Sequence, residues 1–240
     1  MTSAQALTQR RMLEMHRRWA KTKGIPADKI RPQILKLYAP LVSTTDTITF
    51  STDINSNPAN ILPVENRLKR DSVMFVNLFG LAIHKVPIFS GVKYPHNNPL
   101  LFYPDKNVFA DAAVAPGVVP EHQCLESVYN GVLSFKTSQS VRLEDFPCNV
   151  FRNAPQTQNG AAAQPSQGLE LVDISTSFYM FGTVDNKFTL QIGSGSDRNG
   201  IAGGAESQNY AVLLLGGFEV MDGAKSHLRI DEFDAILAEN

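Results

Sequence analysis

The chain has 240 residues and a formal net charge of −1, with 43 % hydrophobic and 19 % charged residues. These values exclude a disordered chain, and the presence of two cysteines excludes a fold that depends on a framework of disulfide bonds. The charge is divided unevenly: residues 10–36 carry nine Lys or Arg and two acidic residues, whereas the rest of the chain carries 13 basic and 21 acidic residues. A basic arm before an acidic body is typical of proteins that contact a polyanion or a neighbouring subunit.

Residues 3–22 are predicted to form an amphipathic helix, since Met12, Met15 and Trp19 recur at a helical spacing and form an apolar stripe. The basic residues expected to contact a polyanion or a membrane surface are Arg10, Arg11, Arg17, Arg18, Lys21 and Lys23. Subunit packing through the apolar stripe ranks first among the roles of this helix. Binding of nucleic acid ranks second and binding of anionic lipid third, and these roles can coexist.

A second short helix is predicted to follow the first. It rests on four apolar residues spaced four, three and four apart, which are Ile30, Ile34, Leu37 and Leu41. Pro32 would be tolerated in its first turn. The two helices together make a basic, amphipathic arm over residues 1–42, and removal of residues 1–36 is expected to leave a folded body.

From residue 43 the hydrophobic period changes to two, which is typical of half-buried strands. Strands are predicted at 45–52, 73–86, 100–103, 127–137, 149–152, 169–181, 186–192 and 209–221. Gly80 predicts a bulge or bend in the second of these, and Asp185-Asn186 predicts a hairpin over residues 173–192.

Short strands with long connections predict a mainly β fold. The body, residues 43–240, is predicted to be a jelly-roll-like β-sandwich with long loops, preceded by the N-terminal helical arm. An immunoglobulin-like sandwich is less consistent with the chain, because the Cys…Trp…Cys pattern is missing.

Nothing in the chain predicts a signal peptide or a membrane span. Arg10 and Arg11 stand where the hydrophobic region of a signal peptide would run, and the longest apolar stretch, around residues 73–83, is too short to cross a bilayer. We therefore expect a protein that is made and soluble in a cytoplasm, with Cys124 and Cys148 as buried free thiols.

No motif predicts catalysis or a cofactor. His122, Cys124 and Cys148 supply at most three of the roughly four ligands that a structural zinc site needs. The glycine-rich loop 193–204 lacks the lysine and the helix of a phosphate-binding loop, and the chain has no G-x-S-x-G motif. We expect no enzyme activity, no cofactor and no metal.

Two segments resemble a known family. Residues 65–83 form a charged lead-in to a long apolar strand with a glycine, and residues 129–136 read Tyr-Asn-Gly-Val-Leu-Ser-Phe-Lys. With the basic arm in front, they resemble jelly-roll capsid and capsid-associated structural proteins of small icosahedral bacteriophages. The resemblance concerns architecture over residues 45–220. It implies a structural role, self-assembly into a closed shell, location in the virion and no active site.

The expected function is therefore that of a capsid subunit. Its partners would be further copies of the chain, other virion proteins and, through the arm, genomic nucleic acid or an anionic membrane, with no small-molecule substrate. The alternative is a β-sandwich binding module of a spike or fibre that recognises carbohydrate or a host surface, with Tyr94, Tyr103 and Tyr129 as candidate stacking residues. A cupin-like enzyme is a third class, and the spacing of the histidines disfavours it.

Overall fold

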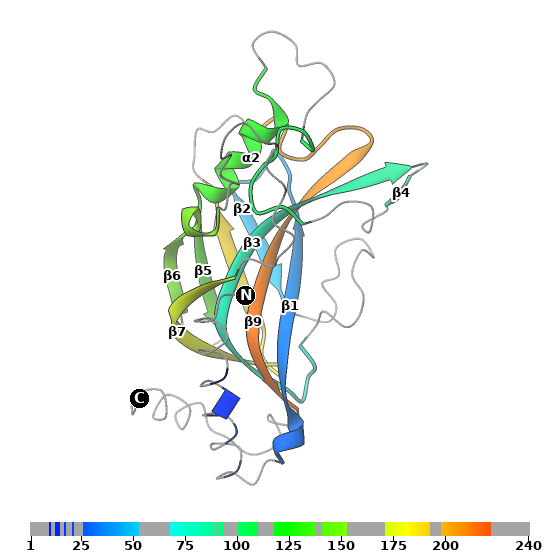
Figure 1. The fold of residues 1–240 in the computed structure, drawn as a ribbon. Coiled ribbons are helices and arrows are strands. Elements are labelled where there is room, and N and C mark those ends of the chain that lie inside the picture. The colour runs from blue at the N-terminus through cyan, green and yellow to red at the C-terminus, as the bar shows by residue number, and fades with distance from the viewer. Residues whose placement is uncertain are drawn as a thin grey trace, which may run out of the picture.

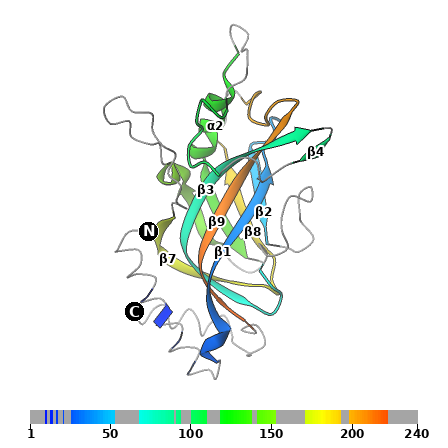
Figure 2. The ribbon, with the colours of Figure 1, turned by 45° about the vertical axis from the view of Figure 1, so that its right-hand side comes forward.

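The structure is a computed structural model of the chain. It describes residues 10, 13, 14, 17, 21, 26–52, 68–89, 91–93, 100–109, 118–137, 141–152, 171–192 and 198–221. Within these residues, two antiparallel β-sheets pack face to face around a common core, and a short helix lies across one end of them (Figures 1 and 2). The prediction of a mainly β fold is confirmed.

The first sheet has five strands. They are β1 (Ile30–Pro40), β3 (Val73–Phe89), β4 (Val92–Lys93), β7 (Val172–Phe181) and β9 (Ser207–Val220). β9 lies between β1 and β3, while β7 and the two-residue β4 both pair with β3, near its opposite ends. The central position of β9 explains why nearly all of its residues are buried.

The second sheet has four strands in the order β2-β8-β5-β6. Their bounds are Thr47–Ser51 for β2, Val132–Thr137 for β5, Val141–Pro147 for β6 and Asn186–Gln191 for β8. The helical elements described over their whole length are α2 (Glu121–Tyr129) and two 3-10 turns, η1 (Ala27–Lys29) and η4 (Cys148–Phe151). α2 leads almost directly into β5, so the helix lies at one end of the second sheet (Figure 1).

Apart from β4, the strand pairs are nested in chain order. β1 pairs with β9, β2 with β8, β3 with β7, and β5 with β6. Two further pairs, β3 with β9 and β5 with β8, join these ribbons into the two sheets. Among the described strands the chain therefore changes sheet between β1 and β2, β2 and β3, β4 and β5, β6 and β7, β7 and β8, and β8 and β9.

Four phenylalanine rings tie the two sheets together in the core. Phe79 and Phe178 come from the first sheet and Phe135 and Phe188 from the second, and all of them are buried. Phe135 and Phe188 stack with their ring centroids 4.2 Å apart, and the Phe135 and Phe178 centroids are 4.6 Å apart. Aromatic pairs at these distances add to the free energy gained by burying the rings.

The predicted second helix of the arm is wrong, because residues 30–40 form strand β1, which pairs with β9 along its whole length. Leu35, Leu37 and Ala39 alternate with more exposed residues and face the core, so a period of two competes with the helical spacing. Pro32 is accommodated because β1 lies at the edge of its sheet. The strand falls within the range assigned to the arm, and removal of residues 1–36 would take away more than half of it.

Three predicted strands also differ from the structure. The segment 127–137 is divided between the end of α2 and β5, and the segment 149–152 falls mostly in η4. Of the segment 100–103, only Leu101 pairs, through an isolated bridge to Ile83. α2 forms instead of a strand because its buried residues, which include Leu125, Val128 and Tyr129, recur at helical spacing.

The predicted bulge is misplaced and the predicted hairpin is wrong. The register of β3 against β9 shifts between Val76 and Leu78, so Asn77 rather than Gly80 is the extra residue. The Asp185-Asn186 turn does exist, and the Asn186 side chain donates hydrogen bonds to the backbone oxygens of Phe181 and Val184. However, β7 and β8 lie in different sheets, so the turn is a crossing between sheets and not a hairpin. The predicted strands at 45–52, 73–86, 169–181, 186–192 and 209–221 are confirmed, within a few residues at their ends.

Candidate functional site

Only part of the predicted arm lies among the described residues. Arg10, Leu13, Glu14, Arg17 and Lys21 all have helical backbone, and every one of them except the half-buried Leu13 is exposed. Arg10 forms an i, i+4 ion pair with Glu14, at 3.4 Å between Nε and Oε1. The other predicted contact residues lie outside the described residues; they are Arg11, Met12, Met15, Arg18, Trp19 and Lys23. The helical arm as a whole therefore stays a prediction, and no helix in the described part of the chain is long and apolar enough for a bilayer span.

Two of the three tyrosines proposed as stacking residues, Tyr103 and Tyr129, lie among the described residues. Tyr129 is fully buried, and its hydroxyl lies 3.3 Å from the Leu101 carbonyl oxygen. The half-buried Tyr103 donates a hydrogen bond to Asp105, and Tyr94 lies outside the described residues. Burial in the core removes Tyr129 as a ligand contact.

The first sheet is apolar on its outer face as well as on the face toward the core. A second cluster of buried residues covers this outer face: Leu78, Ala82, Val86, Phe102, Leu171, Tyr210, Val212 and Leu214. Strands buried on both faces have near-continuous apolar runs instead of alternation. This double burial explains the unbroken runs in β3 and β9.

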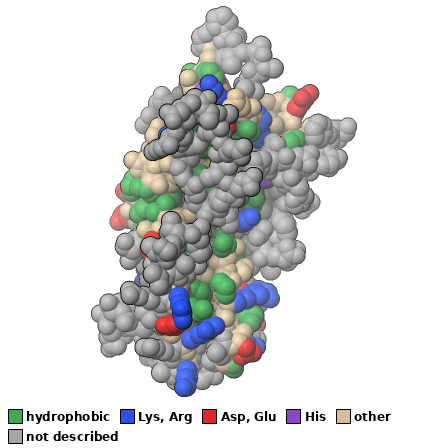
Figure 3. All heavy atoms as spheres, in the orientation of Figure 1, with side chains coloured by type: hydrophobic (Ala, Val, Ile, Leu, Met, Phe, Trp, Pro, Cys, Tyr) green, Lys and Arg blue, Asp and Glu red, His purple; other side chains and the backbone are tan. Residues whose placement is uncertain are grey.

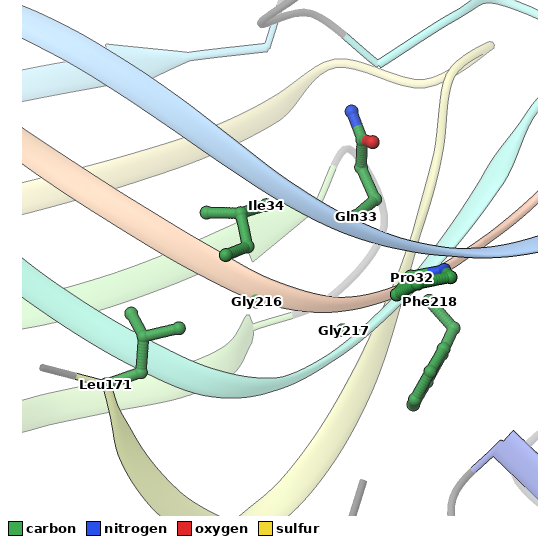
Figure 4. A pocket seen from close by; sticks show the side chains of 7 residues that line it. All are labelled: Pro32, Gln33, Ile34, Leu171, Gly216, Gly217 and Phe218. Atoms are coloured by element: carbon green, nitrogen blue, oxygen red, sulfur yellow. The ribbon is translucent and has the colours of Figure 1, made fainter. Parts of the chain in front are cut away.

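At one end of this outer face lies an open hollow of about 340 Å³. Its lining is Pro32, Gln33, Ile34, Leu171, Gly216, Gly217 and Phe218, and we call it the outer hollow (Figure 4). Ile34 on the edge strand β1 stands directly opposite Gly216 on β9, so no side chain faces it across the strands. The hollow exists because this position of β9 has no side chain.

Gly217 is required by the backbone of β3, and Gly216 is closely surrounded by side chains. A Cβ atom on Gly216 would lie 2.9 Å from Leu171 Cδ1, and one on Gly217 would lie only 1.7 Å from the Phe75 backbone oxygen. The close approach of β3 to Gly217 coincides with the register shift at Asn77. Asn77 is itself buried, and neither polar atom of its side chain has a hydrogen-bond partner.

The chemistry of the outer hollow suits an apolar group. Gln33 carries the only polar side chain of its lining, and Ile34 keeps 37 % of its surface exposed. Lys and Arg side chains lie at the end of the molecule where β1 begins, with some Asp and Glu side chains among them (Figure 3). An apolar depression favours contact with a protein surface over capture of a small polar substrate.

His122, Cys124 and Cys148 were considered as metal ligands, and no metal site was predicted from them. Among the described residues no group of three His, Cys, Asp or Glu side chains is placed to hold a metal ion. Cys124 and Cys148 are buried and not joined by a disulfide, as predicted. Burial raises the pKa of the Cys148 thiol to about 12. This thiol therefore stays protonated and unreactive near neutral pH.

A buried polar cluster at the α2 end of the sandwich was missed by the sequence reasoning. Glu121, the first residue of α2, accepts hydrogen bonds from Lys85 on β3 at 2.7 Å and from Asn209 on β9 at 2.6 Å. The signal for it was a lysine and an asparagine at the ends of otherwise apolar strands. Nothing in the sequence indicated that both meet the same glutamate.

Comparison of the chain with protein-family models, curated proteins and solved structures finds no match. The features of the chain that bear on its function are therefore the topology, the outer hollow and the arm.

Proposed function

We propose that the body is a jelly roll and that the protein is a structural subunit that assembles into the shell of a virus-like particle. The observation that carries the proposal is the nesting of the strand pairs. Without β4 the described chain has eight strands, and the first pairs with the last, the second with the seventh, the third with the sixth and the fourth with the fifth. An eight-stranded, double-sheet architecture of two Greek keys is the jelly roll.

Jelly rolls serve as capsid, lectin and cupin domains, so the architecture alone does not separate these functions. No metal-binding group forms among the described residues, so nothing in them supports a cupin-like enzyme. A lectin-like function is less well supported, because Tyr129, one of its candidate stacking residues, is buried in the core. The outer hollow and the basic arm beside β1 both favour packing against another protein chain.

In this proposal a neighbouring copy of the chain covers the outer hollow, and the arm extends the same contact. Shell subunits bury surface against several neighbours, so termini and edge strands become interface. β1 is an edge strand of 11 residues, and the arm leads directly into it through η1. The exposed basic residues Arg10, Arg17 and Lys21 leave a polyanion, either genome or anionic membrane, as the second contact of the arm.

Deletion of residues 1–25 is expected to leave the sandwich folded and to reduce assembly. The deletion ends before η1 and removes none of β1, whereas a deletion to residue 36 would cut into the sheet. Electron microscopy and light scattering of the purified full chain should show closed shells or regular oligomers, and the shortened chain should shift to smaller species.

Circular dichroism of the shortened chain is the control for folding. A full-length chain that stays a monomer at high concentration and at every salt concentration would exclude the proposal. A shortened chain that assembles as well as the full one would exclude a role for the arm.

Replacement of Ile34 by glutamate is expected to weaken assembly without unfolding the subunit. Ile34 is exposed at the rim of the outer hollow, so a carboxylate there is tolerated in the free subunit but would be desolvated in a contact. Val141→Glu is the matched control, because Val141 is 50 % exposed on β6 of the other sheet. Light scattering of both variants should show smaller assemblies for Ile34→Glu alone, and equal assembly of the two would place the contact elsewhere.

A further inference from the structure

Lys85, Glu121 and Asn209 form a compact group at the α2 end of the core. Glu121 Oε2 accepts from Lys85 Nζ at 2.7 Å, and Glu121 Oε1 accepts from Asn209 Nδ2 at 2.6 Å. One carboxylate therefore holds a primary amine and a primary amide side by side.

The strands hold the amine and the amide on one face of the sheet. Lys85 on β3 is the direct cross-strand partner of Asn209 on β9, and directly opposed residues of an antiparallel pair share a face with their Cβ atoms about 5 Å apart. Ile83 and Ala211, the next residues on that face, belong to the core between the sheets. The side chains of Lys85 and Asn209 therefore start from adjacent points and meet at Glu121.

The group is withdrawn from solvent. The Glu121 side chain is 1 % exposed, the Lys85 side chain 15 %, and Asn209 is fully buried. The Phe109 ring lies under Lys85, with Nζ 5.7 Å from its centroid, and the Cα atom of Glu121 packs closely against Gly200. A buried ion pair carries a desolvation penalty that is relieved when both charges disappear.

The Asn209 amide is held through its nitrogen and not through its carbonyl oxygen. Nδ2 donates to Glu121 and also lies 3.2 Å from the Ile201 carbonyl oxygen, whereas Oδ1 is buried with no hydrogen-bond partner. These contacts place the Glu121 carboxyl group, which can accept and donate a proton, against Asn209 Nδ2. The same carboxyl group also contacts Lys85 Nζ.

We propose that Lys85 and Asn209 join through an intramolecular amide bond whose formation Glu121 catalyses. Oε2 takes a proton from the Lys85 ammonium, and the neutral Nζ attacks Cγ of Asn209. The carboxylic acid passes its proton through Oε1 to Nδ2 and accepts one from Nζ, while the Nζ–Cγ bond forms and the Cγ–Nδ2 bond breaks. The products are one amide, one molecule of ammonia and a protonated Glu121, so atoms and charge balance without an oxidant or a cofactor.

Three physical effects favour the step. The fold holds amine and amide in contact with one catalytic group, which replaces a bimolecular encounter by an intramolecular one. A single carboxyl group acts as base toward the attacking nitrogen and as acid toward the leaving nitrogen, which is general acid–base catalysis. The reaction also removes the buried charges of Lys85 and Glu121, and the protonated Glu121 gains a donor for Asn209 Oδ1.

The mass of the intact, folded full-length protein tests the proposal. The expected mass is lower than that of the sequence by one ammonia molecule. A tryptic digest should contain a branched peptide in which residues 71–93 are joined to residues 199–225, because trypsin does not cleave after an acylated Lys85. Fragmentation of that peptide should place the branch at Lys85 and Asn209.

Four variants separate the roles of the three residues. Glu121→Gln, Lys85→Met and Asn209→Ala should each restore the full sequence mass, and circular dichroism shows whether they are folded. Asn209→Asp should regain the bond with loss of one water molecule, because a carboxylic acid then supplies the same Cγ. Glu219→Gln is the matched control, since Glu219 is an equally buried carboxylate that pairs with Arg31, and it should still lose ammonia.

Three results would overturn the proposal. The first is a folded chain with the full sequence mass whose digest releases residues 71–85 as a free peptide ending at Lys85. The second is conversion of Asn209 to aspartate, which would show that water and not Nζ attacks Cγ. The third is loss of ammonia in the folded Glu121→Gln variant at the wild-type rate, which would remove Glu121 from the reaction. None of these results bears on assembly, so the shell proposal stands or falls separately.

Discussion

A Gly217→Ala variant is expected to lose at least about 3 kcal/mol of its free energy of unfolding, in the range of the largest single-residue effects. The added Cβ would lie 1.7 Å from the Phe75 backbone oxygen and 2.8 Å from the Phe75 carbonyl carbon. Both atoms belong to the backbone of β3, so relief requires β3 and β9 to move apart. The movement would disturb the longest strand pairing of the molecule, and urea unfolding followed by far-UV circular dichroism measures the loss.

Gly204→Ala is the matched control for this experiment. A Cβ on Gly204 would meet no atom within 4 Å, so the change in stability should stay within about 0.5 kcal/mol. Equal stability of the two variants would show that β3 and β9 are farther apart at Gly217 than the structure has them.

A Phe188→Ala variant is expected to lose about 3–5 kcal/mol, the usual cost of removing a buried aromatic ring. Phe188 lies on the second sheet, stacks on Phe135 and also contacts Phe79 and Phe178 of the first sheet. Its removal opens a cavity between the sheets and breaks contacts with three rings at once. The same urea titration measures this loss.

Val150→Ala serves as its control, because Val150 is 45 % exposed and its truncation should cost little. A Phe188→Ala chain that matches this control in stability would mean that the four rings do not hold the sheets together.

The strands could be predicted where one face is buried or where an apolar run has turn residues at its ends. β2 alternates, and β3 and β9 are continuous, so their positions follow from local pattern. The segment of β1 is ambiguous, because Ile30, Ile34 and Leu37 satisfy a helical spacing while Leu35 and Leu37 satisfy a strand spacing. Pairing with β9 decides between them, and that partner lies more than 160 residues away.

The pairing between strands could not be predicted by the same means. A turn such as Asp185-Asn186 shows that the chain bends, but it does not show whether the next strand returns to the same sheet or crosses to the other. The polar cluster could not be predicted for a related reason. Lys85, Glu121 and Asn209 come from three distant segments, and only the packing of α2 against the end of β3 and β9 brings them together.

The state of the two cysteines was easier to predict than the outer hollow. Two cysteines cannot supply a disulfide framework, and both are buried and not joined by a disulfide. The outer hollow depends on two glycines whose significance appears only when Ile34 and Leu171 are seen on either side of them. Glycines in a strand indicate that another backbone segment approaches closely, but they do not indicate which segment it is.

The position of β9 also has a consequence for synthesis on the ribosome. β9 is the shared neighbour of β1 and β3, yet it follows the end of β3 by more than 110 residues. At a rate of roughly 5–20 residues per second, on the order of ten seconds pass between the emergence of β3 and that of β9. During this interval the edges of β1 and β3 that pair with β9 are uncovered beside the ribosome. Slower translation through residues 90–206 should therefore increase aggregation of nascent chains instead of helping them to fold.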